Sequence, residues 1–286
     1  MPEPTVGTTP PRVMTIAGTD SGGGAGIAAD LRALAACGVH GCLAVCAVTV
    51  QNSLGVTGVH TIPAETVAAQ IASVASDIGL QAAKTGMLAT AEIIRAVAAA
   101  CDENGIGVGR ATPFVIDPVA ASMNGDQLLA DSALDSFRDE LFPRATLVTP
   151  NLDEVRLLVD IDVHDRAGQY AAAKALHALG PQNVLVKGGH LAEDADVCVD
   201  LLFDGESFTE LPGPRFATGH THGGGDSLAS AISAGLARGL AVPEAVAFGK
   251  RYIVEAVRWS YPLGAGHGPV SPLWAVTPWW ETGPIE

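Results

Sequence analysis

Short apolar runs alternate along this chain with longer segments in which apolar residues recur at helical spacing. The short runs predict buried strands at 13–17, 42–50, 82–84, 114–117, 145–148 and 184–187. The longer segments predict helices that begin near 26, 63, 90, 127, 151, 165, 228 and 243. Two further runs, 197–203 and 207–211, flank the dipeptide Asp204-Gly205, which is typical of a β-hairpin.

Repeated alternation of strand and helix, with one late hairpin, predicts an α/β protein. The expected architecture has three layers (α/β/α), with a mostly parallel central sheet and helices on both of its faces. Composition does not shift along the chain and no segment repeats, so we expect one domain over residues 13–275. Residues 1–12 are predicted to form a disordered N-terminal tail and residues 276–286 a C-terminal tail.

Composition narrows the classes of function. Of the 286 residues, 48% are hydrophobic and only 16% are charged, which suits a large core. The net charge of −15 argues against nucleic acid or an anionic membrane as a partner, and the sequence has no apolar run long enough to span a bilayer. The five cysteines show no metal-ligand spacing and lie mostly in apolar runs. We therefore expect a cytoplasmic protein with reduced cysteines.

The segment Gly223-Gly224-Gly225-Asp226 stands directly before a helical pattern. Free N–H groups at a helix start, with glycines that permit close approach, form a seat for an anion such as phosphate. A carboxylate at Asp226 would repel that phosphate unless it faces the attacking atom. Its simpler interpretation is a first-turn acid favoured by the helix dipole.

Four strands also end in polar or glycine-rich breaks, and in a parallel sheet these breaks meet at one edge. They are the loop 18–26, Asp117, the segment 151–154 and the segment 187–190. Asp117 and Glu154 could hold a hydrated Mg²⁺, and Lys187 is the best candidate cation for nucleotide phosphates.

Each of these residues also has a structural interpretation. The loop 18–26 lacks the Lys-Ser/Thr of a P-loop and could be a flexible turn. Asn151 and Glu154 fit a capping box, and Asp30 could point into the cleft or complement the helix dipole. Three others could serve as surface or loop-tip residues: Lys187, His222 and Lys250.

The motifs together resemble the hydroxymethylpyrimidine/phosphomethylpyrimidine kinases of thiamine biosynthesis. These enzymes form a branch of the ribokinase superfamily, which also contains pyridoxal kinases. The resemblance extends over about residues 13–275 and rests on segments at 17–31, 48–56, 84–88, 116–119, 149–154, 186–191, 221–226 and 268–270.

The resemblance implies roles for individual residues. Five would contact the aminopyrimidine: Gly18, Asp30, Gln51, Met87 and Val119. Six would lie along ATP: Asn151, Lys187, Gly189, Thr218, His222 and Lys250. Asp117 and Glu154 would serve Mg²⁺, while Gly223, Gly224 and Gly225 would hold the transferred phosphoryl group and Asp226 would act as the base. A homodimer is also expected.

The chain departs from the family pattern in two places. Pyrimidine kinases of this type usually carry Gly-Thr-Gly-Cys at the phosphoryl site, where this chain has an acid in fourth position. The first loop has Gly22 where Ser is common. We therefore expect ATP-dependent phosphorylation of 4-amino-5-hydroxymethyl-2-methylpyrimidine and its monophosphate, with pyridoxal phosphorylation as the alternative suggested by Asp226. A non-catalytic pyrimidine-binding relative is a third hypothesis.

Overall fold

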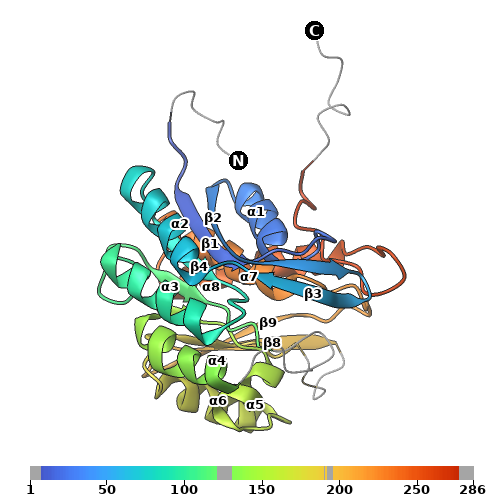
Figure 1. Ribbon diagram of the computed structural model, residues 1–286. Helices are drawn as coiled ribbons and strands as arrows, with labels where there is room; N and C mark the ends of the chain where they lie inside the picture. Colours follow the sequence, from blue (N-terminus) through green and yellow to red (C-terminus); the bar gives the residue numbers. More distant parts are fainter. Residues whose placement is uncertain (1–7, 121–130, 190, 192–195, 277–286) are drawn as a thin grey trace.

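The computed structural model describes residues 8–120, 131–189, 191 and 196–276, and the described chain is built around a nine-stranded sheet (Figure 1). The strand order is β3-β2-β1-β4-β5-β6-β7-β8-β9. The strands are β1 Arg12–Gly18, β2 His40–Asn52, β3 Gly55–Thr61, β4 Ala82–Thr85, β5 Phe114–Ile116, β6 Leu147–Val148, β7 Val184–Val186, β8 Val197–Phe203 and β9 Phe208–Pro214. The neighbouring pairs β2–β1, β1–β4, β4–β5, β5–β6 and β6–β7 are parallel. The pairs β2–β3, β7–β8 and β8–β9 are antiparallel.

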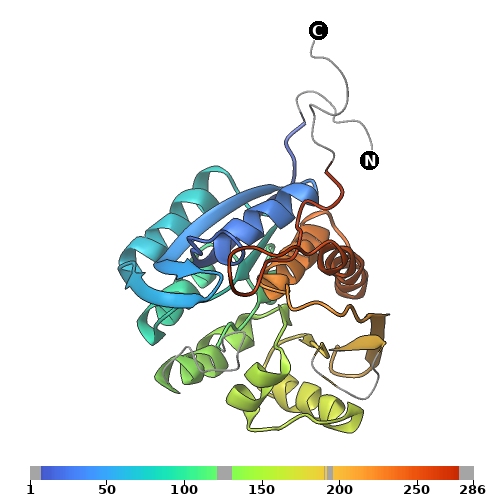
Figure 2. The ribbon, with the colours of Figure 1, turned by 90° about the vertical axis from the view of Figure 1, so that its right-hand side faces the viewer.

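Helices cover both faces of this sheet (Figures 1 and 2). They are α1 Gly26–Ala36, α2 Ala64–Asp77, α3 Ala91–Glu103, α4 Asp131–Ser136, α5 Leu152–Val159, α6 Arg166–His177, α7 Gly224–Ala237 and α8 Val242–Arg258. After α4 the chain continues as a π-helical turn, Phe137–Leu141, and a 3-10 turn, Phe142–Arg144.

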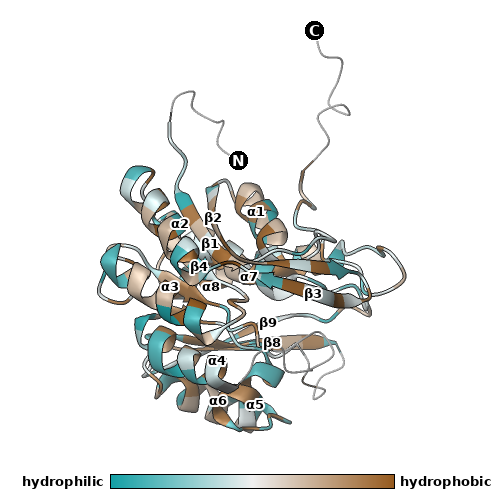
Figure 3. Ribbon diagram, viewed as in Figure 1, coloured by the Kyte–Doolittle hydropathy of each residue, from teal (hydrophilic) through white to brown (hydrophobic). Residues whose placement is uncertain are grey.

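Two apolar clusters fill the spaces between the layers. Side chains of α2 to α6 pack on one face of the sheet, and side chains of α1, α7 and α8 pack on the other. Strand β1 contributes side chains to both clusters, because successive side chains of a strand point to opposite faces. Met14 and Ile16 pack in the first cluster, and Val13 packs in the second. Hydrophobic colour accordingly concentrates on the central strands in Figure 3. The three-layer α/β/α, ribokinase-like fold predicted from the sequence is confirmed.

The β2–β3 hairpin is where the sequence prediction was wrong. The sequence predicts a strand at 42–50 and no strand directly after it, but β2 continues to Asn52 and pairs antiparallel with β3. Most of β3 is exposed on both faces, so it lacks the apolar alternation by which a half-buried strand is recognised.

Some predictions fall outside the described residues. Residues 1–7 and 277–286 of the two expected tails do, as do His190 and the first four residues of the helix expected at 127–141. No helix in the described ranges is long and apolar enough to cross a bilayer.

The order of strands places the site. From β1 the sheet extends through β2 and β3 on one side, and through β4 onward on the other. Ligands of open α/β sheets bind at the carboxyl ends of the strands where the order reverses, which here is between β1 and β4.

Candidate active site

Helix α7 begins with glycines that lie against the first glycine loop. Gly223 is the N-cap, with a left-handed φ of 73°, and Gly224 and Gly225 occupy the first helical positions. A Cβ atom added to Gly223 would overlap the carbonyl oxygen of Gly24. Only glycine therefore meets both the dihedral and the spatial demand at this position. The N–H of Gly224 donates to the Thr221 carbonyl oxygen (3.1 Å), so the expected seat for an anion rests on the neighbouring N–H groups of Gly223 and Gly225.

A contact between Asp20 and His222 links the glycine loop after β1 to the loop before α7. The Asp20 carboxylate accepts hydrogen bonds from the N–H groups of Gly22, Gly24 and Ala25, and His222 Nε2 lies 2.9 Å from Asp20 Oδ2. Burial opposes ionisation of Asp20, but the bonds from His222 and the backbone lower its pKa below the usual value. His222, expected along ATP, thus holds the loop that follows β1.

Asp226 lies in the first turn of α7, with its side chain 15% exposed. Burial raises its pKa to about 6, and the nearby ammonium of Lys84 opposes that rise. Lys84 Nζ is 3.9 Å from Asp226 Oδ1. At neutral pH the carboxylate is therefore mainly ionised, with a pKa closer to 7 than that of an exposed Asp, which suits a general base.

Lys187, Asp117 and Glu154 form a cluster beside the start of α7. Lys187 Nζ lies 3.0 Å from Asp117 Oδ1 and 3.8 Å from Glu154 Oε2. A Cβ on Gly225 would lie 3.2 Å from both Asp117 Oδ2 and Lys187 Nζ, so the missing side chain brings this cluster against the helix start. The predicted convergence of strand ends at one edge is therefore present.

Protonation within this cluster follows from burial and pairing. Burial raises the pKa of Glu154 to about 7, which Lys187 partly offsets. Burial disfavours the Lys187 ammonium, but the carboxylates of Asp117 and Glu154 outweigh this effect and raise its pKa. Glu154 also forms the predicted capping box with Asn151: each side chain bonds the other residue's backbone N–H.

The glycine turn after β7 is held by an arginine. Arg215 donates to the carbonyl oxygens of Gly189 (2.5 Å) and Leu191 (2.6 Å). Gly188 donates its N–H to Asp200 and has no room for a Cβ, because that atom would overlap the Val199 carbonyl. This turn is thus fixed in place directly after Lys187.

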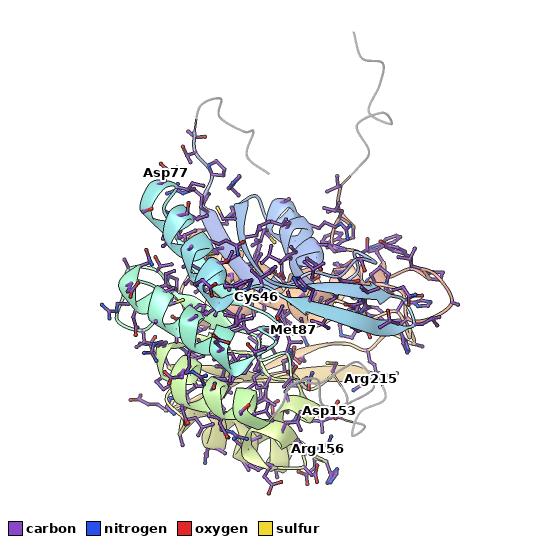
Figure 4. All side chains as sticks on the ribbon, in the orientation of Figure 1. Cys46, Asp77, Met87, Asp153, Arg156 and Arg215 are labelled. Atoms are coloured by element: carbon purple, nitrogen blue, oxygen red, sulfur yellow. The ribbon has the colours of Figure 1, made fainter. Side chains whose placement is uncertain are left out.

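Of the residues expected around the pyrimidine, Gly18 at the end of β1 and Met87 after β4 lie against each other. A Cβ on Gly18 would lie 2.6 Å from the Met87 methyl, so the Met87 side chain covers the Gly18 backbone; Met87 is labelled in Figure 4. Gln51 exchanges two backbone bonds with the Ser21 hydroxyl, and its side-chain oxygen accepts from Thr49. Val119 is half-buried two residues beyond Asp117.

Three predicted contact residues have their polar groups engaged elsewhere. Asp30 is completely buried and accepts from Thr15, Lys84 and Ser230, so the structure places its carboxylate behind the site and not against a substrate. The Lys250 ammonium is buried and bonded to Asp200 and the Cys198 carbonyl, so it is not a solvated surface charge. The Thr218 hydroxyl bonds Ser260 and accepts from the His220 N–H.

Sequence reasoning missed Lys84, Asp20 and Arg215 as site residues. The one usable signal was Lys84 itself, a single charged residue at the end of an apolar run in a predicted buried strand. Asp20 resembles an ordinary turn residue, and Arg215 simply follows a hairpin. The sequence therefore does not distinguish either of them from a residue outside the site.

Fold and site together define a ribokinase-like kinase. A glycine-rich helix start, an adjacent carboxylate and a lysine beside two acids are parts that suit phosphoryl transfer. The chain belongs to the phosphomethylpyrimidine kinase family, whose model matches residues 20–271. It is 60% identical to the hydroxymethylpyrimidine/phosphomethylpyrimidine kinase of Mycobacterium leprae, covering 97% of this chain and 99% of the relative. Its identity to the enzyme of the same name in Streptomyces coelicolor is 50%, covering 96% and 99%.

The solved structures that resemble this chain include pyridoxal kinases and a phosphomethylpyrimidine kinase. The pyridoxal kinase of Bacillus subtilis, in an ADP complex, superposes with a TM-score of 0.84 at 34% identity, covering 93% of this chain and 99% of that one. The phosphomethylpyrimidine kinase of Clostridium difficile superposes with a TM-score of 0.74, also at 34% identity, covering 86% and 99%.

Proposed function

We propose that this chain transfers the γ-phosphoryl group of ATP to 4-amino-5-hydroxymethyl-2-methylpyrimidine and then to its monophosphate, in thiamine biosynthesis. The observation that carries the proposal is the position of Asp226 in the first turn of α7, directly after the three glycines and 3.9 Å from the Lys84 ammonium. Asp226 accepts the proton of the substrate hydroxyl, whose oxygen bonds to the γ-phosphorus as the bond to ADP breaks. The N–H groups of Gly223 and Gly225 receive the transferred phosphoryl oxygens, and the N–H of Gly224 joins them when it leaves the Thr221 carbonyl.

Mg²⁺ fits the donor set on one side of this seat. Asp117 and Glu154 offer two carboxylates beside the Lys187 ammonium, and Mg²⁺ usually takes one or two carboxylates and completes its shell with phosphate oxygens and water. Bound there, Mg²⁺ would neutralise charge on the phosphates, while Lys187 and Asn151 orient the nucleotide.

The pyrimidine would lie between the Gly18 backbone, Met87, Gln51 and Val119. The Gln51 amide offers both a donor and an acceptor, which suits an aminopyrimidine edge. Met87 already covers Gly18, so it would shift or pack over the ring. Asp30 is not among these proposed pyrimidine contacts, because its carboxylate is buried and bonded within the protein.

Pyridoxal is the second candidate substrate, because the Bacillus subtilis pyridoxal kinase superposes with a TM-score of 0.84. An assay coupled to ADP release, with each alcohol at equal concentration, separates the two. We expect kcat/KM for the hydroxymethylpyrimidine to exceed that for pyridoxal by at least about 100-fold, as expected when buried polar groups must match the substrate. Turnover of pyridoxal alone would overturn the proposal, and the monophosphate as substrate tests the second step.

We also propose a homodimer formed through the β2–β3 hairpin. Five aliphatic side chains of the hairpin are exposed: Val48, Val50, Leu54, Val56 and Val59. Residues 48–61 include no Asp, Glu, Lys or Arg, whereas the whole chain carries a net charge of −15. Two like-charged copies would therefore meet with least repulsion and most apolar burial at this hairpin.

Val50→Asp tests this interface, since Val50 is 62% exposed. Sedimentation equilibrium should show a dimer for the unmodified chain and a shift of at least about tenfold in the dissociation constant for the variant, the effect of one desolvated charge. Val276→Asp is the matched control at a valine that is 55% exposed outside the hairpin. A monomeric unmodified chain, or equal effects of the two substitutions, would contradict the proposed dimer.

A further inference from the structure

A fully buried ion pair lies directly beneath the proposed base. Lys84 on β4 and Asp30 on α1 are both 0% exposed, with Lys84 Nζ 2.6 Å from Asp30 Oδ1. Thr15, which pairs with Lys84 across the β1–β4 ladder, donates to Asp30 Oδ2, and Ser230 donates to Oδ1. The Asp30 carboxylate is therefore saturated by groups from two strands and one helix.

The same lysine also reaches Asp226. Asp226 and Ser230 are four residues apart on α7, so they share one helix face. Ser230 bonds Asp30 on this face, and Asp226 Oδ1 lies 3.9 Å from Lys84 Nζ. Gly86 lies beside both groups, since a Cβ there would be in ordinary van der Waals contact with Asp226 Oδ1 (3.6 Å) and Lys84 Nζ (3.7 Å).

Stability alone is a weak explanation for this pair. Removing two charges from water costs several kcal/mol per ion, and replacing buried ion pairs by apolar residues is often neutral or stabilising. What an apolar pair could not supply is a positive charge next to the buried end of a carboxylate.

We propose that Lys84 is a positioning residue, held by Asp30, that keeps the Asp226 carboxylate ionised and oriented toward the substrate hydroxyl. The proposal rests on the proposed function in one respect, namely that Asp226 is the base. Asp30 thereby acts on the reaction through Lys84, without touching a substrate.

Charges from four elements face Asp226, and they differ in sign. Burial raises the pKa of Asp226, and the carboxylates of Asp30 on α1 and Asp117 after β5 raise it further. The Lys84 ammonium on β4 and the Gly26 N–H lower it. Lys187, after β7, also interacts with Asp226 electrostatically. Loss of Lys84 should thus move the titration of Asp226 to higher pH, and loss of the Asp30 charge should move it to lower pH.

The test compares Asp30→Asn with the double variant Lys84→Met/Asp30→Asn. Lys84→Met alone would leave the Asp30 carboxylate buried and unpaired, which is costly to folding, so the double variant is preferred. The readout is the ¹³C carboxyl NMR titration of Asp226 in the ligand-free protein, assigned with Asp226→Asn. Lys174→Met, the same substitution at an exposed lysine of α6, is the control.

We expect the Asp226 titration to lie about one pH unit higher in the double variant than in Asp30→Asn, as loss of an opposite charge within about 4 Å implies. Relative to the unmodified chain it should move down in Asp30→Asn and stay unchanged in Lys174→Met. A merely structural pair would lower thermal stability without these shifts. A midpoint in the double variant that is equal to or below that of Asp30→Asn overturns the proposal. This result needs no turnover, so failure of the proposed function would show separately, as absence of kinase activity in the unmodified chain.

Discussion

Asp226→Asn should lower kcat for the hydroxymethylpyrimidine by about 100- to 10,000-fold, the range for loss of a general base. Asparagine keeps the shape of the side chain but accepts no proton from the substrate hydroxyl. Thermal stability at pH 7 should be equal or higher. The folded-state pKa of about 6 lies above the unfolded value near 3.8, so stability through this group falls as pH rises from about 4 to 6. Asparagine removes the buried charge that causes this loss.

The pH profile of the unmodified enzyme provides an independent check. Because the base must be ionised, kcat should fall as pH drops below about 6, where Asp226 becomes protonated. Asp77→Asn is the control, since Asp77 is exposed at the far end of α2 (Figure 4), and it should leave kcat unchanged. If Asp226→Asn retains kcat within about tenfold, below the usual contribution of a base, the glycine N–H groups suffice and Asp226 is not the base.

Gly223→Ala should lower kcat/KM by about 100- to 1,000-fold, because it moves the donors of the phosphoryl seat. Two effects combine at this position: a φ of 73°, and the overlap of the new Cβ with the Gly24 carbonyl oxygen. The backbone strain alone costs about 1–2 kcal/mol. The overlap adds to it by forcing apart the two loops that Asp20 and His222 hold together.

Gly239→Ala separates these two effects. Gly239 also has a positive φ, of 87°, but a Cβ there would meet nothing within 4 Å. Urea unfolding should show a loss of about 1–2 kcal/mol from strain, while kcat/KM stays within about twofold because the phosphoryl seat is untouched. Equal activity losses in the two alanine variants would mean that contact between the glycine loops is not needed for catalysis.

The layout of the fold could be predicted from the sequence because it depends on local signals. Apolar runs such as 13–17 and 114–117 predict buried parallel strands, and polar breaks after them predict the edge at which a site forms. Strand β3 could not be predicted, because a hairpin exposed on both faces has no apolar face to recognise.

The side-chain partners in the site were less predictable, because they depend on pairs that are distant in sequence. The separation is 54 residues for Asp30 and Lys84, and 50 residues for Asp200 and Lys250. Spacing along a chain does not reveal such pairs. The resemblance to a family predicts ligand contacts for Asp30 and Lys250, and it does not reveal that both side chains are engaged with charged partners inside the protein.

The hydrogen bond from Ser230 to Asp30 bears on how this enzyme matures. It closes a loop of 200 residues, and the Asp20–His222 pair closes one of 202 residues. During synthesis, β1, α1 and β4 emerge from the ribosome early, but the helix that completes their charged centre comes only after most of the chain. Contacts of such long range form slowly, because the connecting chain must first be ordered. We therefore expect phosphotransfer competence to be acquired only once α7 has packed against α1.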